Sequence, residues 1–285
     1  MKDIILRNET LTVHVNALGA ELKGVEMNGV EYLWQGGADT YPRTSPTLFP
    51  VMGRFLSDTY YVGEKDYRMQ LNGFAMDANF AVTRRGGDHI TFTLTDSEKT
   101  RKIYPFSFAL HVGYALAGSR VTVRHRVENT GDQPLPFCIG AHTAYKWPLT
   151  EGEAPEDCYL RFEKKETLRS FNPFGLELPF LDDTDIRPLS HDLFSNYTRS
   201  LRGLQSEWVE LASKKHGHAV RIHRGQYPYL AIWSLPTPDA ALICLEPSTS
   251  VHPGNHPSLH LEDRDGAILL PPGETCDREF TVEFR

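Results

Sequence analysis

The stretch VTVRHRV, residues 121–127, decides the fold class. Its valines and its histidine occupy every second position, and threonine and arginine side chains lie between them. Side chains of a strand point alternately to the two faces of a sheet, so this period of two places one set in a core and the other in water. The same alternation recurs in residues 11–16, 90–95 and 280–285. The pattern predicts half-buried antiparallel strands.

Turn signals separate the strand patterns. The dipeptide Asn28-Gly29 lies between residues 25–27 and 30–33 and predicts a hairpin, because both residues tolerate the positive φ that a tight turn needs. The 22 glycines and 19 prolines agree with many turns, and helical periodicity is almost absent. We therefore predict an all-β fold, a large antiparallel sandwich in which residues 1–285 form one domain.

The segment 151–202 is harder to interpret. It is rich in proline, aspartate and aromatic residues. We interpret it as a long irregular excursion, either a wall of a site or a surface flap, with a short helix at residues 189–194.

Charge and composition exclude several classes of protein. The formal net charge of −7 argues against a polyanion partner, and the cationic residues 99–102 are interpreted as a solvated turn or helix face. No apolar run approaches the roughly 18 residues of a membrane helix, and the N-terminus lacks a signal peptide. We expect a cytoplasmic protein, monomer or homodimer, that binds neither nucleic acid nor membrane. The four cysteines are widely spaced, which argues against a disulfide framework or a thiolate zinc site.

Three histidines, His252, His256 and His260, are spaced four residues apart, as metal ligands on a helix would be. The prolines and the glycine between them oppose a helix, so we interpret the segment as a loop and predict no metal. Motifs of nucleotide binding, of serine hydrolases and of zinc proteases are also missing from the sequence.

Three polar residues follow apolar runs. Glu246 follows residues 240–245, where partial burial at the end of a strand would raise its pKa and make it a better general base; the alternative is an exposed or ion-paired residue. His142 follows a similar run and could exchange a proton at neutral pH, or could be structural. Arg54 could donate paired hydrogen bonds to hydroxyl groups, or could be a surface cation.

In chain order, several segments resemble the aldose 1-epimerase (mutarotase) family, most closely its LacX-like branch. The resemblance covers nearly the whole chain and is weakest at 151–202. The matching segments are residues 31–35, 48–54, 72–77, 104–108, 129–142, 232–234 and 243–247.

The resemblance implies a galactose mutarotase-like β-supersandwich with an open cleft for a small-molecule sugar. It implies that Glu246 removes the proton of the anomeric hydroxyl and that His142 protonates the ring oxygen. It also implies that Arg54 and Asn72 bind the sugar. No metal or organic cofactor is implied, since opening a cyclic hemiacetal needs only an acid and a base.

The chain departs from the family pattern at four places. Asn72 replaces a sugar-binding histidine, Met76 an arginine, Thr143 a proline and Ser248 a bulky aromatic residue. Asparagine can still donate and accept hydrogen bonds, whereas methionine cannot replace a bidentate cation.

Four functions are therefore compared. The leading hypothesis is a mutarotase acting on a hexose or related sugar, and the alternative is a non-catalytic carbohydrate-binding or regulatory protein that retains the cleft. A mutarotase for a charged sugar is disfavoured by Met76, and a glycosidase using Asp77 with Glu246 is more distant. Trp233 and Tyr145 are candidate platforms for a sugar ring, with ordinary packing as the alternative.

Overall fold

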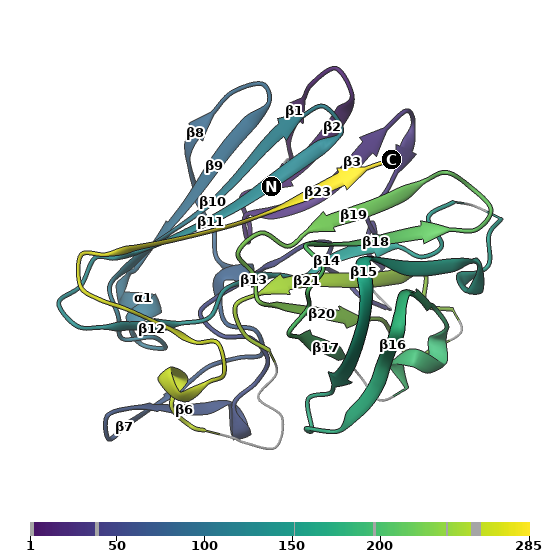
Figure 1. Cartoon of the computed structure of the whole chain (residues 1–285). Coiled ribbons are helices and arrows are strands. Elements are labelled where there is room, and N and C mark those ends of the chain that lie inside the picture. The colour runs from purple at the N-terminus through teal and green to yellow at the C-terminus, as the bar shows by residue number, and fades with distance from the viewer. Residues whose placement is uncertain (1–2, 38–39, 151, 196–197, 238, 252–257) are drawn as a thin grey trace.

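The computed structural model describes residues 3–37, 40–150, 152–195, 198–237, 239–251 and 258–285 (Figure 1). Strands dominate it, and the predicted all-β class is confirmed. Helix is confined to short turns, which are α1 (Glu98–Arg101), η1 (Leu56–Asp58), η2 (Ala75–Asp77), η3 (Pro155–Asp157), η4 (His191–Phe194) and η5 (Leu261–Asp263). In the described part of the chain, no helix has the length and hydrophobicity needed to cross a membrane.

A 15-stranded antiparallel sheet forms most of the molecule. Its strands are β5 (Thr47–Leu48), β8 (Ala81–Arg85), β9 (His89–Thr95), β10 (Phe108–Ala117), β11 (Arg120–Asn129), β13 (Gly140–Ala141), β14 (Thr143–Lys146), β15 (Cys158–Phe171), β16 (Glu177–Pro188), β17 (Arg199–Arg202), β18 (Trp208–Ser213), β19 (Ala219–His223), β20 (Tyr229–Trp233), β21 (Leu242–Ser248) and β23 (Thr275–Phe284). Their order is β5-β13-β21-β20-β17-β15-β18-β19-β23-β11-β10-β9-β8, with β14 beside β21 and β16 beside β15.

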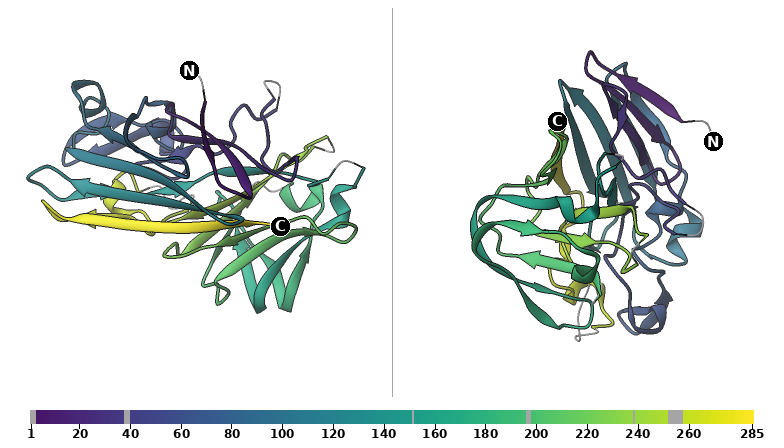
Figure 2. Two further views of the ribbon diagram at one scale, coloured as in Figure 1. Left: turned by 90° about the horizontal axis from the view of Figure 1, so that it is seen from above. Right: turned by 90° about the vertical axis from the view of Figure 1, so that its right-hand side faces the viewer.

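A four-stranded sheet packs against the long strands of the large sheet (Figure 2). The Tyr114 hydroxyl of β10 donates a hydrogen bond of 2.7 Å to the carbonyl of Ala20, and the rings of Tyr32 and Phe284 meet edge to face at 5.3 Å. Two small strand pairs complete the fold. The remaining strands are β1 (Ile4–Arg7), β2 (Leu11–Asn16), β3 (Glu21–Met27) and β4 (Val30–Glu31) of the second sheet, and the pairs β6 (Thr59–Val62) with β7 (Lys65–Arg68) and β12 (Leu135–Phe137) with β22 (Ile268–Leu270).

The period-two patterns lie where they were predicted. Strands β2, β9, β11 and β23 include the four alternating segments except for the last residue, Arg285, and in β11 the valines and His125 are buried. The Asn28-Gly29 turn joins β3 to β4, with φ values of 53° and 80°. The cationic residues 99–102 fall on α1 and the residue after it, where Lys99 and Arg101 are exposed as expected.

The prediction for segment 151–202 was wrong in one respect. The segment is not irregular, because it contains β15 and β16, strands of 14 and 12 residues that pair with each other. Three register shifts interrupt their pairing, and Asp183 has a positive φ of 46°. These bulges disturb the alternation that sequence analysis relies on. The short helix expected at residues 189–194 is present as η4.

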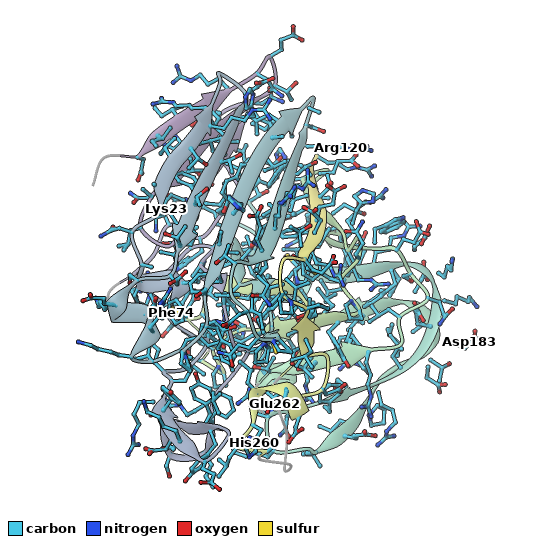
Figure 3. The ribbon with its side chains drawn as sticks, turned by 90° about the vertical axis from the view of Figure 1, so that its left-hand side faces the viewer. Lys23, Phe74, Arg120, Asp183, His260 and Glu262 are labelled. Atoms are coloured by element: carbon cyan, nitrogen blue, oxygen red, sulfur yellow. The ribbon has the colours of Figure 1, made fainter. Side chains whose placement is uncertain are left out.

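An aromatic cluster occupies the interior beside β5 and β10. The Phe49 ring lies 5.2–6.1 Å from the rings of Phe74, Tyr104, Phe108 and Phe137, and all five side chains are buried. In Figure 3, Phe74 lies within the body of the molecule, whereas Asp183 lies at the outer edge formed by β15 and β16. The cluster fixes the chain on both sides of Phe49, immediately before the segment that contains Arg54.

Candidate functional site

Glu246 lies inside β21, not at its end as predicted. The strand continues to Ser248, and all seven of its residues are buried. Neighbouring apolar residues remove water from the carboxyl group. Because burial disfavours the charged form, it raises the pKa of Glu246 to about 8. The carboxyl group therefore has the proton affinity of a general base that works near neutral pH.

His142 faces Glu246 across a break in the sheet. Strand β14 pairs with β21 as far as Leu245, and β13 resumes the pairing at Ser248. Pro247, which lies in this gap, has no N–H to donate to a ladder. His142 occupies the gap on the other side, and its Nε2 lies 3.4 Å from Oε1 of Glu246. The interruption of strand pairing between β14 and β13 along β21 thus leaves His142 beside the carboxyl group of Glu246.

Two aromatic residues pack around the imidazole. The ring of Tyr41 stacks on His142 at 5.4 Å with an interplanar angle of 23°, and its hydroxyl lies 3.1 Å from Nδ1. Trp233 meets both rings edge to face, at 5.3 Å from Tyr41 and 5.6 Å from His142. Burial, together with the nearby Cys244 and Glu246, raises the pKa of the Tyr41 hydroxyl above its ordinary value. The imidazole is therefore held by a stacked ring, by an edge-to-face ring and by a hydrogen bond at Nδ1.

The structure places Arg54 and Asn72 in contacts of their own. Arg54 is 59% exposed at its side chain, and its Nε lies 3.2 Å from Oδ1 of Asp58. Asn72 accepts a hydrogen bond of 2.7 Å from the N–H of Gly53 and donates its own N–H to the Gly53 carbonyl. Within the described residues, no hydrogen bond or ion pair joins either of them to His142 or Glu246. Their roles in sugar binding remain predictions.

The other departures from the family pattern also have structural roles. The Thr143 hydroxyl lies 2.7 Å from that of Ser45, and Ser248 donates to the Ser250 carbonyl at 2.6 Å. The Met76 side chain is partly buried and packs against the hydrophobic core. Each of these three side chains is thus integrated into the scaffold.

Asp77, the second carboxylate considered for a glycosidase, is held by two neighbours. It forms an ion pair with Arg43 and accepts a hydrogen bond from Gln70. Its side chain is 48% exposed, in contrast to that of Glu246. These contacts give Asp77 a bracing role between η2 and the segment before β5.

One group of described residues could hold a metal ion. Donor atoms of His142, Cys244 and Glu246 all lie within 4.8 Å of one another. Burial, and secondly the charge of Glu246, raises the pKa of the Cys244 thiol well above its ordinary value. A metal ion would therefore have to displace a thiol proton in addition to binding the imidazole and the carboxyl group. The absence of a metal remains a prediction from the sequence.

The structure describes three of the remaining candidate residues, His260, Tyr145 and Trp233. His260 lies against the Tyr61 ring at 6.1 Å, and its Nδ1 is 3.7 Å from Oε1 of Glu262; Figure 3 labels His260 and Glu262 side by side. His252 and His256 lie outside the described residues. Tyr145 is fully buried, which favours packing over contact with a sugar, whereas Trp233 is partly exposed.

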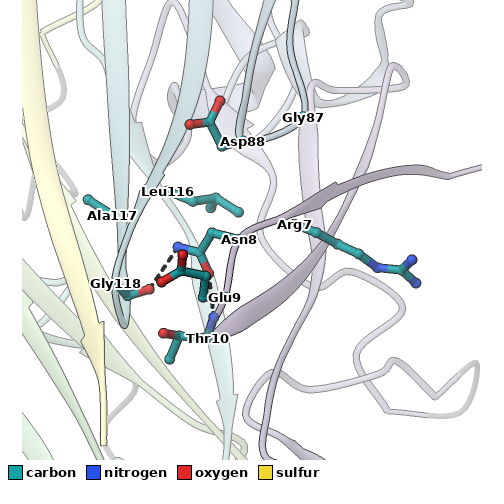
Figure 4. Close-up of a pocket in the computed structure, with 9 residues that line it drawn as sticks. All are labelled: Arg7, Asn8, Glu9, Thr10, Gly87, Asp88, Leu116, Ala117 and Gly118. Carbon is teal, nitrogen blue, oxygen red and sulfur yellow. Dashed lines mark hydrogen bonds between the residues drawn. The ribbon is translucent and has the colours of Figure 1, made fainter.

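A separate cavity of about 420 Å³ lies among the ends of three hairpins (Figure 4). Asn8 crosses it and donates a hydrogen bond of 2.9 Å to the Gly118 carbonyl. Its lining includes Arg7, Glu9 and Asp88 but none of the predicted site residues. The cavity offers no paired acid and base comparable with His142 and Glu246.

We expect Asn72→Ala to lower the free energy of unfolding by about 1–3 kcal/mol, because the buried N–H of Gly53 loses its acceptor and because alanine tolerates the positive φ of 62° less well than asparagine does. Urea unfolding measures the change, and Asn72→Asp, which retains the acceptor oxygen, is the matched control. An unchanged stability in Asn72→Ala would show that this hydrogen bond contributes little.

The raised pKa of Glu246 also predicts a pH-dependent stability. Between the ordinary pKa of 4.5 and the folded value of about 8, the folded chain binds a proton that the unfolded chain has lost. This group therefore reduces stability as pH rises, by at most about 1.4 kcal/mol per pH unit. Glu246→Gln should gain in melting temperature over wild type from pH 5 to pH 8. A constant difference between the two proteins over this range would contradict the raised pKa.

Comparisons with known proteins identify the family and the fold. A family model described as aldose 1-epimerase matches residues 2–282. The plasmid form of protein LacX from Lactococcus lactis subsp. lactis is 32% identical over 98% of each chain. A galactose mutarotase related enzyme from Lactobacillus acidophilus superposes with a TM-score of 0.93 and 29% identity, covering 100% of this chain and 97% of that one. A galactose mutarotase-like protein from Lactobacillus casei gives a TM-score of 0.91 and 28% identity over 100% of both chains. The chain therefore belongs to the aldose 1-epimerase family and has the galactose mutarotase-like fold.

Proposed function

We propose that this protein is an active aldose 1-epimerase that interconverts the α and β anomers of a hexose or related sugar. The observation that carries the proposal is the separation of 3.4 Å between His142 Nε2 and Glu246 Oε1. The two oxygens that exchange protons in mutarotation, the anomeric hydroxyl and the ring oxygen, are bonded to the same carbon. An acid and a base held side by side match this arrangement.

Ring opening moves two protons and breaks one bond. The Glu246 carboxylate accepts the proton of the anomeric hydroxyl, and the electron pair of that O–H bond forms the carbonyl at C1. The bond between C1 and the ring oxygen breaks, and His142 Nε2–H donates a proton to the departing oxygen. The products are an open-chain aldehyde, a protonated, neutral Glu246 and a His142 imidazolate, so the negative charge has moved from the carboxylate to the imidazole.

Ring closure reverses these roles after rotation about the C1–C2 bond. His142 Nε2 accepts the proton of the C5 hydroxyl as that oxygen attacks the other face of the carbonyl. Glu246 returns its proton to the carbonyl oxygen, which becomes the new anomeric hydroxyl. Both residues regain their starting states, so the cycle needs no redox or group-transfer cofactor.

Burial makes Glu246 a stronger base in this cycle. A desolvated carboxylate with a pKa of about 8 binds a proton more strongly than an exposed one. The partner that we propose is a small neutral sugar, since Met76 stands where the family pattern has an arginine and the Arg43 cation is already paired with Asp77.

A specific observation supports a second candidate, a protein that binds a sugar without turning it over. Arg54 contacts Asp58, and Asn72 contacts Gly53, so two expected sugar ligands have structural partners. A site with the acid and base but weakened substrate contacts would bind without effective catalysis. Turnover measurements separate the two candidates.

The proposed activity predicts that wild-type protein accelerates the approach of freshly dissolved α-glucose or α-galactose to anomeric equilibrium in a polarimeter. Glu246→Gln removes the base and should lower the rate by roughly 10²–10⁴. Glu166→Gln is the matched control, because Glu166 is equally buried but is bound to the backbone N–H groups of Gln205 and Ser206. It should retain activity if folded.

Two outcomes would oppose the proposal. Equal rates for wild type and Glu246→Gln would remove the carboxylate from the mechanism. Sugar binding without acceleration, across a panel of aldoses monitored by exchange between anomeric NMR signals, would establish the non-catalytic candidate instead.

The pH dependence follows from the same carboxyl group. Only the ionised form of Glu246 accepts a proton, so kcat/KM should fall as pH decreases through about 8, approaching tenfold per pH unit below that value. Initial rates from pH 5 to pH 9.5, corrected for the spontaneous reaction, measure this limb. A profile that is flat between pH 5 and pH 8 would exclude a base with a raised pKa.

A further inference from the structure

Tyr41 contacts the imidazole edge that does not face Glu246. Its hydroxyl lies 3.1 Å from Nδ1 of His142, and Nε2 of the same ring lies 3.4 Å from Glu246. The two nitrogens are on different edges of the imidazole, so one ring connects the phenol to the carboxyl group. The hydroxyl and the stacked ring of Tyr41 together restrain the position and the rotation of His142.

We propose that Tyr41 is a positioning residue that donates its hydroxyl hydrogen to Nδ1 and thereby keeps the proton of neutral His142 on Nε2. A neutral imidazole has one N–H and one acceptor nitrogen, and the hydrogen bond at one nitrogen determines the state of the other. With Nδ1 occupied as an acceptor, Nε2 carries the hydrogen and directs it toward the side of the ring where Glu246 lies.

The segment between β4 and β5 is built to hold Tyr41 in this place. The Tyr41 carbonyl accepts hydrogen bonds from the Trp34 indole at 2.8 Å and from the Gly37 N–H at 3.3 Å. Farther along, the buried carboxylate of Glu21 accepts the N–H groups of Thr44 and Ser45, at 2.6 and 3.0 Å.

The same segment is hydrogen-bonded to His142 itself and to the residue two positions after it. The His142 N–H donates to the carbonyl of Pro46 at 3.2 Å, and the Ala144 N–H donates to the carbonyl of Thr44 at 2.8 Å. These hydrogen bonds fix the backbone near Tyr41 relative to the backbone of His142. Such a second layer of support is what maintains a catalytic group in a productive geometry.

The kinetic consequence rests on the proposed mutarotation, in which Nε2–H is the acid. Removing the hydroxyl leaves the stacked ring in place but allows the imidazole to rotate and to change the nitrogen that carries the proton. The loss should therefore reduce kcat and have little effect on KM, because Tyr41 acts through His142 and needs no contact with the sugar.

The first experiment measures the imidazole directly. Long-range ¹H–¹⁵N correlation spectra of ¹⁵N-histidine-labelled protein, recorded at pH 9 so that Glu246 is ionised, are compared for wild type and Tyr41→Phe, with His142→Asn identifying the signals. We expect wild-type His142 to have a protonated Nε2 and a hydrogen-bonded, unprotonated Nδ1. In Tyr41→Phe the Nδ1 signal should move toward the value of an unbonded nitrogen.

Tyr60→Phe is the matched control. Tyr60 is buried, and its hydroxyl donates to the Ile103 carbonyl at 2.9 Å, so the variant loses one tyrosine hydroxyl elsewhere. It should leave the His142 signals unchanged. Trp34→Phe removes the indole N–H that holds the Tyr41 carbonyl and should give a smaller change than Tyr41→Phe in the same direction, should Tyr41→Phe fail to fold.

Kinetics supply the second measurement. Tyr41→Phe should lower kcat by about three- to tenfold, the range expected for one neutral hydrogen bond, with KM nearly constant. Tyr60→Phe should retain the wild-type kcat.

The outcomes separate this inference from the proposed function. A wild-type His142 protonated on Nδ1 at pH 9, or an unchanged Nδ1 signal in Tyr41→Phe, would overturn the role of Tyr41 whether or not the protein is active. An unchanged kcat in an active Tyr41→Phe would do the same. If the wild-type protein lacks turnover, the proposed function fails, and the NMR comparison alone decides the role of Tyr41.

Discussion

The candidate site depends on the burial of one carboxyl group. Glu246 lies in the middle of a strand whose seven residues are all buried, a position that normally takes an apolar side chain. Removing a carboxylate from water costs free energy unless hydrogen bonds or charges compensate it, so this position reduces the stability of the fold. The same cost raises the pKa of the group and makes it a stronger base. Residues that serve activity often show this conflict with stability.

Several polar contacts fix the segment between β4 and β5. The N–H groups at residues 44 and 45 bind the carboxylate of Glu21, and Arg43 bridges to Asp77 and to the carbonyl of Met76. The segment between β4 and β5 is thereby fixed beside the break at His142. These groups orient the imidazole through backbone and aromatic contacts, and they do so without placing another charge next to the buried carboxyl group.

The sequence predicted the fold from local periodicity and the acid–base pair mainly from a family resemblance. Alternation in β2, β9, β11 and β23 was readable because each strand has one buried face, whereas the bulges in β15 and β16 disturbed the pattern. The apolar run before Glu246 indicated desolvation, but Pro247 suggested a strand end where the strand in fact continues. Tyr41 gave no local signal at all. Its contact with His142 joins residues 101 positions apart in the chain, and no periodicity reports such a contact.

The energetics of the pair fit the proposed proton transfer better than they fit passive binding of a sugar. A binding site can also use a glutamine, whose neutral amide forms weaker hydrogen bonds than a carboxylate but is less costly to bury. A buried carboxyl group with a raised pKa, 3.4 Å from an imidazole nitrogen, is useful chiefly where a proton must move. The contacts of Arg54 with Asp58 and of Asn72 with Gly53 affect a different quantity, the strength with which the site binds the unreacted sugar. A site that retains its proton-transfer pair but binds sugar weakly would have a high KM. It would still lower the barrier to ring opening, because catalysis depends on interactions gained in the transition state.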